Sequence, residues 1–357
     1  MGVPLAGSRP RAGRLLVAVA SALLVVIGLV QLLDRWGVLG LGLATWRPTL
    51  YAYIIWGVAL CVGQVMIRGE RGQQALFVLP AVLFTAAMAI FPMLFGLWIA
   101  FSDWNLSAFA GRRFNGFDNI RAMFHDWFYW NAMWNMVLYT AAVLIEYTIA
   151  FGLALLLSAD IRARKLFRVA FLLPLMLTPV AVSWMIGKSL MEYRFGPVAR
   201  FARWVGWESP TFFATPGIAK LGIMTIDAWT FIPFMMIMLL AGLQALPREI
   251  MEAARVDGAN AWQTFWKVIF PLMLPVSLTT IVLRIIFKLK LADIVINVTA
   301  GGPGGATDTV TSFIFREYRD RSNVGYGTML AMVYLVIIIV FVTLLINLAS
   351  RHMRRVT

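Results

Sequence analysis

Eight long apolar runs recur along the 357-residue chain, and they constrain its fold more than any other feature. Each run approaches the roughly 20 residues that cross the hydrocarbon core of a bilayer as a helix. Hydrophobic residues make up 61% of the chain and charged residues 13%, a balance typical of membrane proteins. The sequence therefore predicts an all-α, polytopic membrane protein with about eight transmembrane helices. The expected spans are residues 15–33, 48–67, 75–101, 136–158, 167–190, 218–243, 272–298 and 326–349.

Basic residues in the connections between these runs set the predicted orientation. Cytoplasmic segments of membrane proteins carry an excess of Lys and Arg. Arg68 and Arg71 lie in one short connection, and Arg162, Arg164 and Lys165 lie in another. The longer connections mix Arg with Asp and Glu. Because the number of spans is even, we expect both termini on the cytoplasmic side of the cytoplasmic membrane.

Composition argues against several other classes of protein. The net charge of +14 would suggest nucleic-acid binding in a soluble domain, but here the membrane orientation accounts for it. Cys61 is the single cysteine, which excludes an internal disulfide and a thiolate metal cluster. His125 and His352 lie in different connections, so no histidine pair is expected. We predict no catalytic residue, no metal site and no nucleic-acid partner.

A polar stretch, residues 245–271, separates two of the apolar runs and predicts a helix-turn-helix. Pro247 suits the first turn of a helix. Gly258 supplies the permissive backbone with which a helix ends and the chain turns. A second helix is expected from Ala261, and Pro271 marks its return into the membrane.

The composition of this loop favours a protein partner over lipid. Helices that lie on lipid usually present a polar face rich in Lys and Arg. Here the first helix carries Glu249, Glu252 and Asp257, so Glu252 is expected to present its carboxylate to a basic partner. Small residues would let a partner surface approach closely: Ala253, Ala254, Gly258 and Ala259. We therefore expect a cytoplasmic protein to dock here.

The same loop resembles the EAA motif of binding-protein-dependent ABC importer permeases. In that motif Glu-Ala-Ala is followed after three residues by Gly, and after nine more by Ile, any residue, Leu and Pro. The segment Glu252-Ala253-Ala254 and Gly258 match at this spacing. Val268 replaces the Ile and Phe270 replaces the Leu, and both replacements are apolar. The part that resembles the docking helix is intact.

The resemblance extends over about 280 residues, to the carbohydrate-importing, maltose-type permeases. It implies a six-helix permease core in residues 75–357, with the coupling loop at 245–271, and two additional N-terminal helices in residues 1–74. The matching motifs are FSDW at 101–104, FDN at 117–119, FLLP at 171–174, AGLQALP at 241–247 and TAGGP at 299–303.

The resemblance also implies the partners of the chain. Such a subunit pairs with a second permease subunit, two cytoplasmic ATPase subunits receive the coupling loops, and an external binding protein delivers a carbohydrate. ATP and Mg would bind the ATPase, and no cofactor is expected in this chain. The residues implied in coupling are Glu252, Ala253, Ala254, Arg255, Asp257 and Gly258.

Charged residues inside the apolar runs predict a solute pathway. Such residues are costly in a membrane and are functional by default. Asp227 lies in the sixth run, and Arg284 and Lys288 lie four residues apart on one face of the seventh. Glu146 has no partner that the sequence identifies. In the maltose-type family the positions that resemble Asp227, Phe231, Phe234, Arg284, Phe287 and Lys288 line the sugar site.

Two interpretations of these charges remain open. Asp227 either helps to bind the solute or only neutralises Arg284 or Lys288 across two packed helices. If the three charges face a cavity, two cations against one carboxylate leave a positive surplus. That surplus would suit an acidic, phosphorylated or sulfonated sugar as well as a polyol.

Two other function classes are less consistent with the sequence. A secondary transporter more often contains internal repeats with broken helices at matching places, and none is recognised here. A membrane enzyme would need paired carboxylates or histidines in one neighbourhood, whereas the acidic residues are dispersed. The sequence is best explained as a transport subunit.

Overall fold

The computed structural model describes residues 10–35, 39–43, 45–109, 111–159, 162 and 164–356. The chain forms two compact units, Met1–Phe95 and Gly96–Thr357. The division falls inside one helix, α3 (Glu70–Ala100), whereas the boundary predicted from the sequence comes after residue 74.

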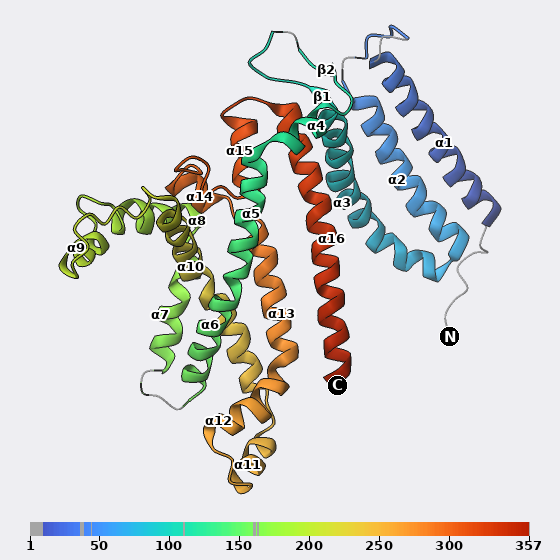
Figure 1. The fold of residues 1–357 in the computed structure, drawn as a ribbon. Helices are drawn as coiled ribbons and strands as arrows, with labels where there is room; N and C mark the ends of the chain where they lie inside the picture. Colours follow the sequence, from blue (N-terminus) through green and yellow to red (C-terminus); the bar gives the residue numbers. More distant parts are fainter. Residues whose placement is uncertain are drawn as a thin grey trace, which may run out of the picture. The chain divides into compact units, whose positions relative to one another are not determined.

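The first unit is a helical hairpin followed by most of α3. Helices α1 (Pro10–Arg35) and α2 (Arg47–Arg68) pack side by side (Figure 1). Trp56 Nε1 donates a hydrogen bond of 2.9 Å to Ser21 Oγ, which joins the two helices. Gln31 is fully buried, and its side-chain oxygen accepts a hydrogen bond from the backbone N–H of Thr49. Polar contacts therefore fix the register of an otherwise apolar pair.

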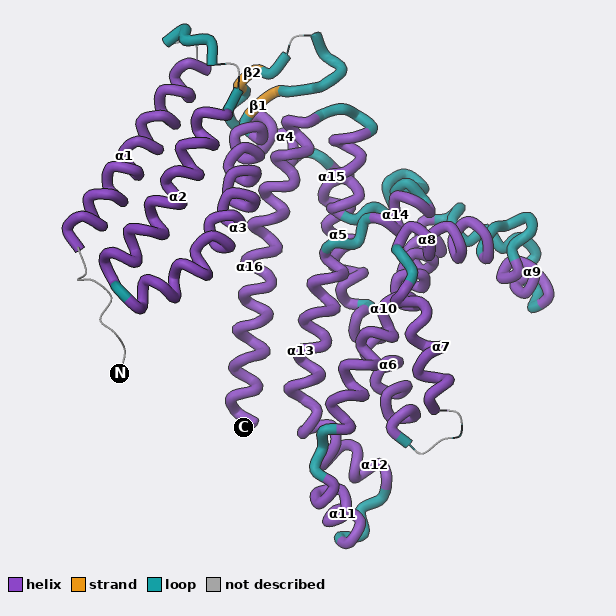
Figure 2. The backbone as a smooth tube through the Cα atoms, turned by 180° about the vertical axis from the view of Figure 1, so that it is seen from behind, coloured by secondary structure: helices purple, strands orange, loops and turns teal. Residues whose placement is uncertain are grey.

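The second unit begins with a short antiparallel pair, β1 (Ser102–Asp103) and β2 (Arg113–Phe114), in which Ser102 lies opposite Phe114. Helices then follow to the C-terminus, as the tube in Figure 2 shows. Their bounds are α4 (Asp118–His125), α5 (Trp127–Ala141), α6 (Val143–Ser158), α7 (Arg164–Met176), α8 (Pro179–Val182), the π-helical η1 (Ser183–Leu190), α9 (Pro197–Trp204), α10 (Pro216–Gln244), α11 (Arg248–Val256), α12 (Ala261–Thr264), the π-helical η2 (Phe265–Ile269), α13 (Phe270–Leu289), α14 (Asp293–Val298), α15 (Val310–Arg319) and α16 (Val324–Val356).

The eight-span prediction is confirmed when one bent helix pair is counted as a span. Among the described residues, seven helices are long and apolar enough to cross a membrane, and the pair α7 and α8–η1 passes the same test together. The span predicted over 167–190 is not one continuous helix, because the chain bends by 99° between Met176 and Pro179. Pro179 starts the new helix, and Thr178 Oγ1 caps it by accepting from the N–H of Ala181.

The span predicted over 272–298 ends earlier than expected, since α13 ends at Leu289 and α14 is separate. Hydroxyl groups from other parts of the chain donate hydrogen bonds to carbonyl oxygens that would otherwise accept from the next turn of the helix. Thr311 and Tyr334 donate to the carbonyl of Leu289, and Thr309 donates to that of Leu291. These bonds satisfy carbonyl groups that the end of a helix leaves without partners.

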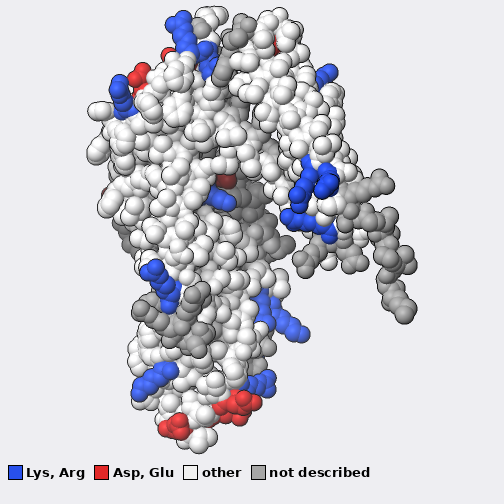
Figure 3. Space-filling model, turned by 90° about the vertical axis from the view of Figure 1, so that its right-hand side faces the viewer, with Lys and Arg blue, Asp and Glu red and all other residues white. Residues whose placement is uncertain are grey.

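The core of the second unit lies among α5, α6, α10, α13 and α16. Many apolar side chains outside it are exposed, as expected of helices that face lipid. At the opposite end from β1 and β2, α11 and α12 form the tip of the unit (Figure 1). Acidic side chains gather at this tip in Figure 3, where Glu249, Glu252 and Asp257 are exposed.

Candidate functional site

The predicted coupling loop forms a compact hairpin, which we call the coupling hairpin (residues 245–271). Helix α11 ends at Val256 in a Schellman motif. The N–H of Ala259 donates to the carbonyl of Ala254 at 3.0 Å, and the N–H of Gly258 donates to that of Arg255 at 3.1 Å. Gly258 has a φ of 71°, in the left-handed region that favours glycine. The predicted turn is therefore present.

The second arm of the hairpin begins at Ala261, as predicted, and continues into the membrane-spanning α13. Asn260 caps it in a reciprocal arrangement. Asn260 Oδ1 accepts from the N–H of Gln263 at 2.9 Å, and Gln263 Oε1 accepts from the N–H of Asn260 at 3.0 Å. Both helix ends of the turn are thus fixed by local hydrogen bonds.

The exposed surface of α11 carries most of the residues that the EAA motif implies in coupling. Exposed are Glu252, Ala253, Arg255, Asp257 and Gly258. Ala254 is 7% exposed, so it belongs to the interior of the hairpin and not to the surface where a partner would approach. The surface of small residues that a partner could approach closely is therefore smaller than the sequence predicts, because Ala254 does not belong to it.

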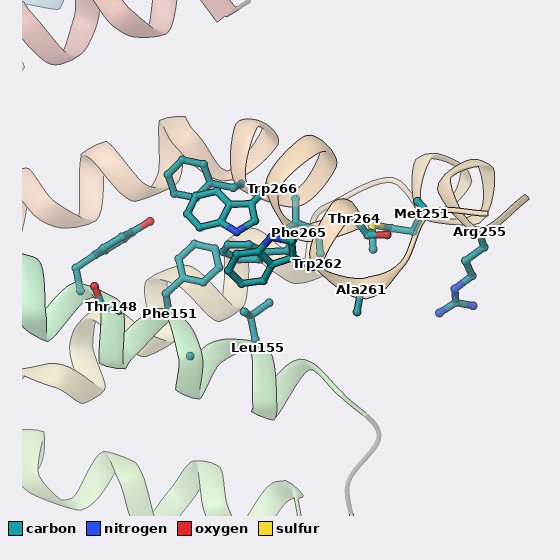
Figure 4. A pocket seen from close by; sticks show the side chains of 15 residues that line it. Thr148, Phe151, Leu155, Met251, Arg255, Ala261, Trp262, Thr264, Phe265 and Trp266 are labelled. Carbon is teal, nitrogen blue, oxygen red and sulfur yellow. The ribbon is translucent and has the colours of Figure 1, made fainter. Parts of the chain in front are cut away.

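A pocket of about 840 Å³ is lined by residues of both the coupling hairpin and α6 (Figure 4). Aromatic side chains form much of its wall. Trp262 and Trp266 lie with their ring centroids 5.6 Å apart, and Phe265 lies 5.0 Å from Trp266. Phe151 of α6 meets Phe265 edge-on at 5.5 Å. The hairpin is thereby packed directly against a membrane-spanning helix.

Four charged side chains meet deep in the second unit, and we call them the charge quartet: Glu146, Asp227, Arg284 and Lys288. They come from α6, α10 and α13, and their side chains are 0–3% exposed. Arg284 Nε donates to Glu146 Oε2 at 2.7 Å, and Lys288 Nζ donates to Glu146 Oε1 at 2.8 Å. Both cations also donate to Asp227 Oδ2. Each carboxylate is thus shared by both cations.

The quartet corrects the charge balance expected from the sequence. The predicted positive surplus is wrong, because Glu146 supplies a second carboxylate and two anions balance two cations. The ion pairs of Asp227 with Arg284 and Lys288 are present. Glu146 lies 138 residues from Arg284 in the chain, a pairing that no local pattern predicts. The position of Glu146 inside an apolar run was the sequence signal that pointed to a functional role.

Three phenylalanines, all named in the sequence prediction, lie beside the quartet. The guanidinium carbon of Arg284 lies 4.4 Å from the ring centroid of Phe231. Phe231 and Phe287 stack at 5.9 Å, and Phe234 meets Phe287 edge-on at 5.3 Å. Phe287 is 40% exposed. The six predicted pathway residues therefore form one cluster, in which the charges are buried and an aromatic face is accessible.

Arg284 keeps one donor without a partner among the described residues. Its Nη1 is buried and makes no hydrogen bond, whereas Nε and Nη2 are bound to the two carboxylates. Buried donors normally have a partner. The orientation of the guanidinium group is fixed by the two carboxylates, which accept from Nε and Nη2, and by the ring of Phe231.

The glycine-rich loop (residues 299–309) is held by side chains from α5. Asn135 Nδ2 donates to the carbonyls of Ala306 and Asp308, at 2.7 and 2.9 Å. The carboxylate of Asp308 accepts from Ser312 Oγ at 3.0 Å and from Arg316. Burial raises the pKa of Asp308 to about 6, although Arg316 opposes the rise. This network was not predicted from the sequence.

Comparison with known proteins identifies the family. Residues 147–355 match the family described as "Binding-protein-dependent transport system inner membrane component". The sulfoquinovosyl glycerol transport system permease protein SmoG of Agrobacterium fabrum is 31% identical over 74% of this chain and 86% of its own length. The trehalose/maltose transport system permease protein MalF of Thermococcus litoralis is 28% identical over 74% of this chain and 90% of its own.

A solved structure supports the fold independently. A chain of the bacterial alginate ABC transporter in complex with an alginate pentasaccharide-bound periplasmic protein superposes with a TM-score of 0.66. The match covers 81% of this chain and 96% of that one at 19% identity. With a matched family that spans more than half of its residues, the chain belongs to the inner membrane components of binding-protein-dependent ABC importers, which are transport subunits and not enzymes.

Proposed function

We propose that this chain forms half of a carbohydrate pathway through the cytoplasmic membrane and couples to a separate ATPase through the coupling hairpin. The exposed, charged surface of α11 at the tip of the second unit carries this proposal. The two caps at Gly258 and Asn260 hold the tip in one shape, so a force applied to it moves the hairpin as a body. Helix α11 joins α10 and α13, which both contribute to the charge quartet.

The partners follow from what this chain brings to the assembly. We propose a second permease subunit beside it, two ATPase subunits that bind ATP and Mg below it, and an external binding protein above it. Glu252, Arg255 and Asp257 are the charged groups of the docking face, and Ala253 and Gly258 allow close approach. Both termini then lie in the cytoplasm, on the same side as the hairpin.

The solute is proposed to be a neutral, polyhydroxylated carbohydrate. The quartet has no net charge, which removes the sequence-based argument for the anionic alternative. Phe287 offers an exposed ring on which a sugar can stack, with Phe231 and Phe234 behind it. One relative is named for trehalose and maltose, which are neutral, and another for sulfoquinovosyl glycerol, which carries a sulfonate. These names support a carbohydrate, and the neutrality of the solute rests on the quartet alone.

Co-purification tests the coupling proposal. The permease, expressed with the other subunits of its importer, should retain an ATP-hydrolysing subunit through detergent extraction. Glu252→Lys places a cation where a basic partner surface is expected, and Gly258→Trp obstructs close approach, so both should abolish retention. Glu208→Lys makes the same change of charge at an exposed site outside the hairpin and should retain the ATPase. Full retention by both hairpin variants would refute this docking face.

Uptake into proteoliposomes tests the choice of solute. Trehalose and maltose are suitable neutral probes, and a sugar phosphate is a suitable anionic probe. We expect a neutral sugar to be accumulated when the binding protein and ATP are present. Accumulation of the sugar phosphate alone would favour the anionic alternative.

A further inference from the structure

Helix α6 contacts the coupling hairpin at one end and the charge quartet at the other. Near the hairpin, the ring of Phe151 lies 5.5 Å from Phe265 and 6.5 Å from Phe270. Phe265 also touches Trp266, which pairs with Trp262. Figure 4 shows Phe151 and Leu155 on α6 facing these rings. A movement of the second arm of the hairpin would therefore act on α6 through these aromatic contacts.

The next contact lies one helical turn further along α6. Tyr147 and Phe151 are four residues apart and share a face, with ring centroids 5.7 Å apart. Tyr147 donates its hydroxyl to Ser277 Oγ at 2.8 Å, and Ser277 lies in the buried part of α13. This bond joins α6 to the helix that follows the hairpin.

The adjacent residue, Glu146, completes the series. Its two oxygens bind Arg284 and Lys288 separately, at 2.7 and 2.8 Å, one helical turn apart on α13. Both cations reach Asp227 on α10 as well. Glu146 is the one charge of the quartet that comes from outside the two helices joined by the hairpin. It therefore fastens α6 to both of them.

We propose that α6 is the mechanical link between the coupling hairpin and the charge quartet, and that Glu146 is the positioning residue that makes α6, α10 and α13 move together. The proposal rests on the proposed function, because it requires the hairpin to receive movement from an ATPase. Removing one partner of a buried ion pair leaves the remaining charges uncompensated, so α6 cannot shift alone. Toward the other end of α6, the aromatic contacts of Phe151 likewise make α6 move together with the coupling hairpin.

The test compares transport with ATP hydrolysis in the complete importer. Wild type and Glu146→Gln are reconstituted with the partner permease, the ATPase and the binding protein, and solute uptake per ATP hydrolysed is measured. Glutamine keeps the shape of the side chain but cannot balance two cations. We expect uptake per ATP to fall about tenfold while hydrolysis continues, as for the loss of a coupling between two sites. Glu146→Asp, which keeps the charge, should recover part of the ratio.

A double variant separates charge balance from a general loss of structure. Glu146→Gln with Lys288→Gln removes one charge of each sign and should raise the ratio above that of Glu146→Gln alone. Lys290 lies at the end of the same helix, is exposed and forms no ion pair among the described residues. Glu146→Gln with Lys290→Gln is therefore the matched control and should give no recovery.

The outcomes distinguish this inference from the function on which it rests. If wild type retains no ATPase, the proposed function fails. If wild type couples normally and an assembled Glu146→Gln importer transports with the wild-type ratio, the link through α6 is refuted. If Glu146→Gln does not assemble, Phe151→Leu decides, since it keeps all four charges. A wild-type ratio for Phe151→Leu would then refute the link.

Discussion

Gly258 is a single residue on which the shape of the coupling hairpin depends. Its φ of 71° is unfavourable for residues with a side chain, yet a Cβ built there has nothing within 4 Å. Gly258→Ala should therefore act through the backbone alone and destabilise the hairpin by about 1–2 kcal/mol. We expect weaker retention of the ATPase subunit, measured as a rise in its dissociation constant. Gly217→Ala, at an equally open helical site, should change nothing.

Asp308 gives the glycine-rich loop a predictable dependence on pH. Its pKa is raised from 3.8 to about 6 by burial, so the folded state binds a proton more tightly than the unfolded state. Stability from this group is therefore greatest below pH 4, falls as the pH rises from 4 to 6, and is constant above that. The change amounts to about 2–3 kcal/mol.

Thermal unfolding in detergent measures this effect. The midpoint of wild type minus that of Asp308→Asn should be more positive at pH 4.5 than at pH 7. The same difference for Asp320→Asn, an exposed site nearby, should not depend on pH in this way. Equal differences at both pH values for Asp308→Asn would contradict the assignment.

At the scale of elements, the bend between α7 and α8 determines how the fifth span lies in the bilayer. A straight helix would separate positions 180 and 189 by about 13 Å along its axis. The 99° bend turns this segment nearly perpendicular to α7. Single cysteines at Val180 and Ser189, both exposed, are placed in a Cys61→Ala background and labelled with a fluorophore. Depth-dependent quenching should report similar depths, and a difference near 13 Å would restore the straight span.

Elements were predicted well where the signal was local and poorly where it was not. The helical turn at Gly258 and the second arm from Ala261 follow from capping preferences that act over a few residues. The early end of α13 depends on hydroxyl groups of Thr311 and Tyr334, which lie far along the chain. Pro179 was a local signal for the bend after Met176. The prediction rested on the length of the apolar run and did not use this signal.

The residues of the candidate site were likewise predicted well where the signal was local and poorly where it was not. Arg284 and Lys288 were placed on one helix face because the spacing of four residues is enough. The ion pairs of Glu146 depend on how α6 packs against α13, which a single sequence does not reveal. The sequence therefore predicted the six pathway residues of the cluster but missed Glu146, and with it the charge balance.

At the scale of the whole molecule, the number of spans is eight when the bent pair α7 and α8–η1 is counted as one. On that count, we expect both termini and the coupling hairpin, which follows the sixth span, to lie on one side of the membrane. Green fluorescent protein fused after Thr357 should fluoresce, because it folds in the cytoplasm. Alkaline phosphatase inserted between β1 and β2, after residue 108, should be active, because it folds outside. An active phosphatase at the C-terminus would reverse the orientation and remove the hairpin from any cytoplasmic ATPase.

The neutrality of the charge quartet has an energetic consequence for a membrane held at a voltage. An unbalanced charge that moves across the bilayer gains or loses about 2.3 kcal/mol per 100 mV. Two carboxylates and two cations that move together have no net coupling to this field. The proposed rearrangement of α6, α10 and α13 should thus proceed equally well in energised and de-energised cells.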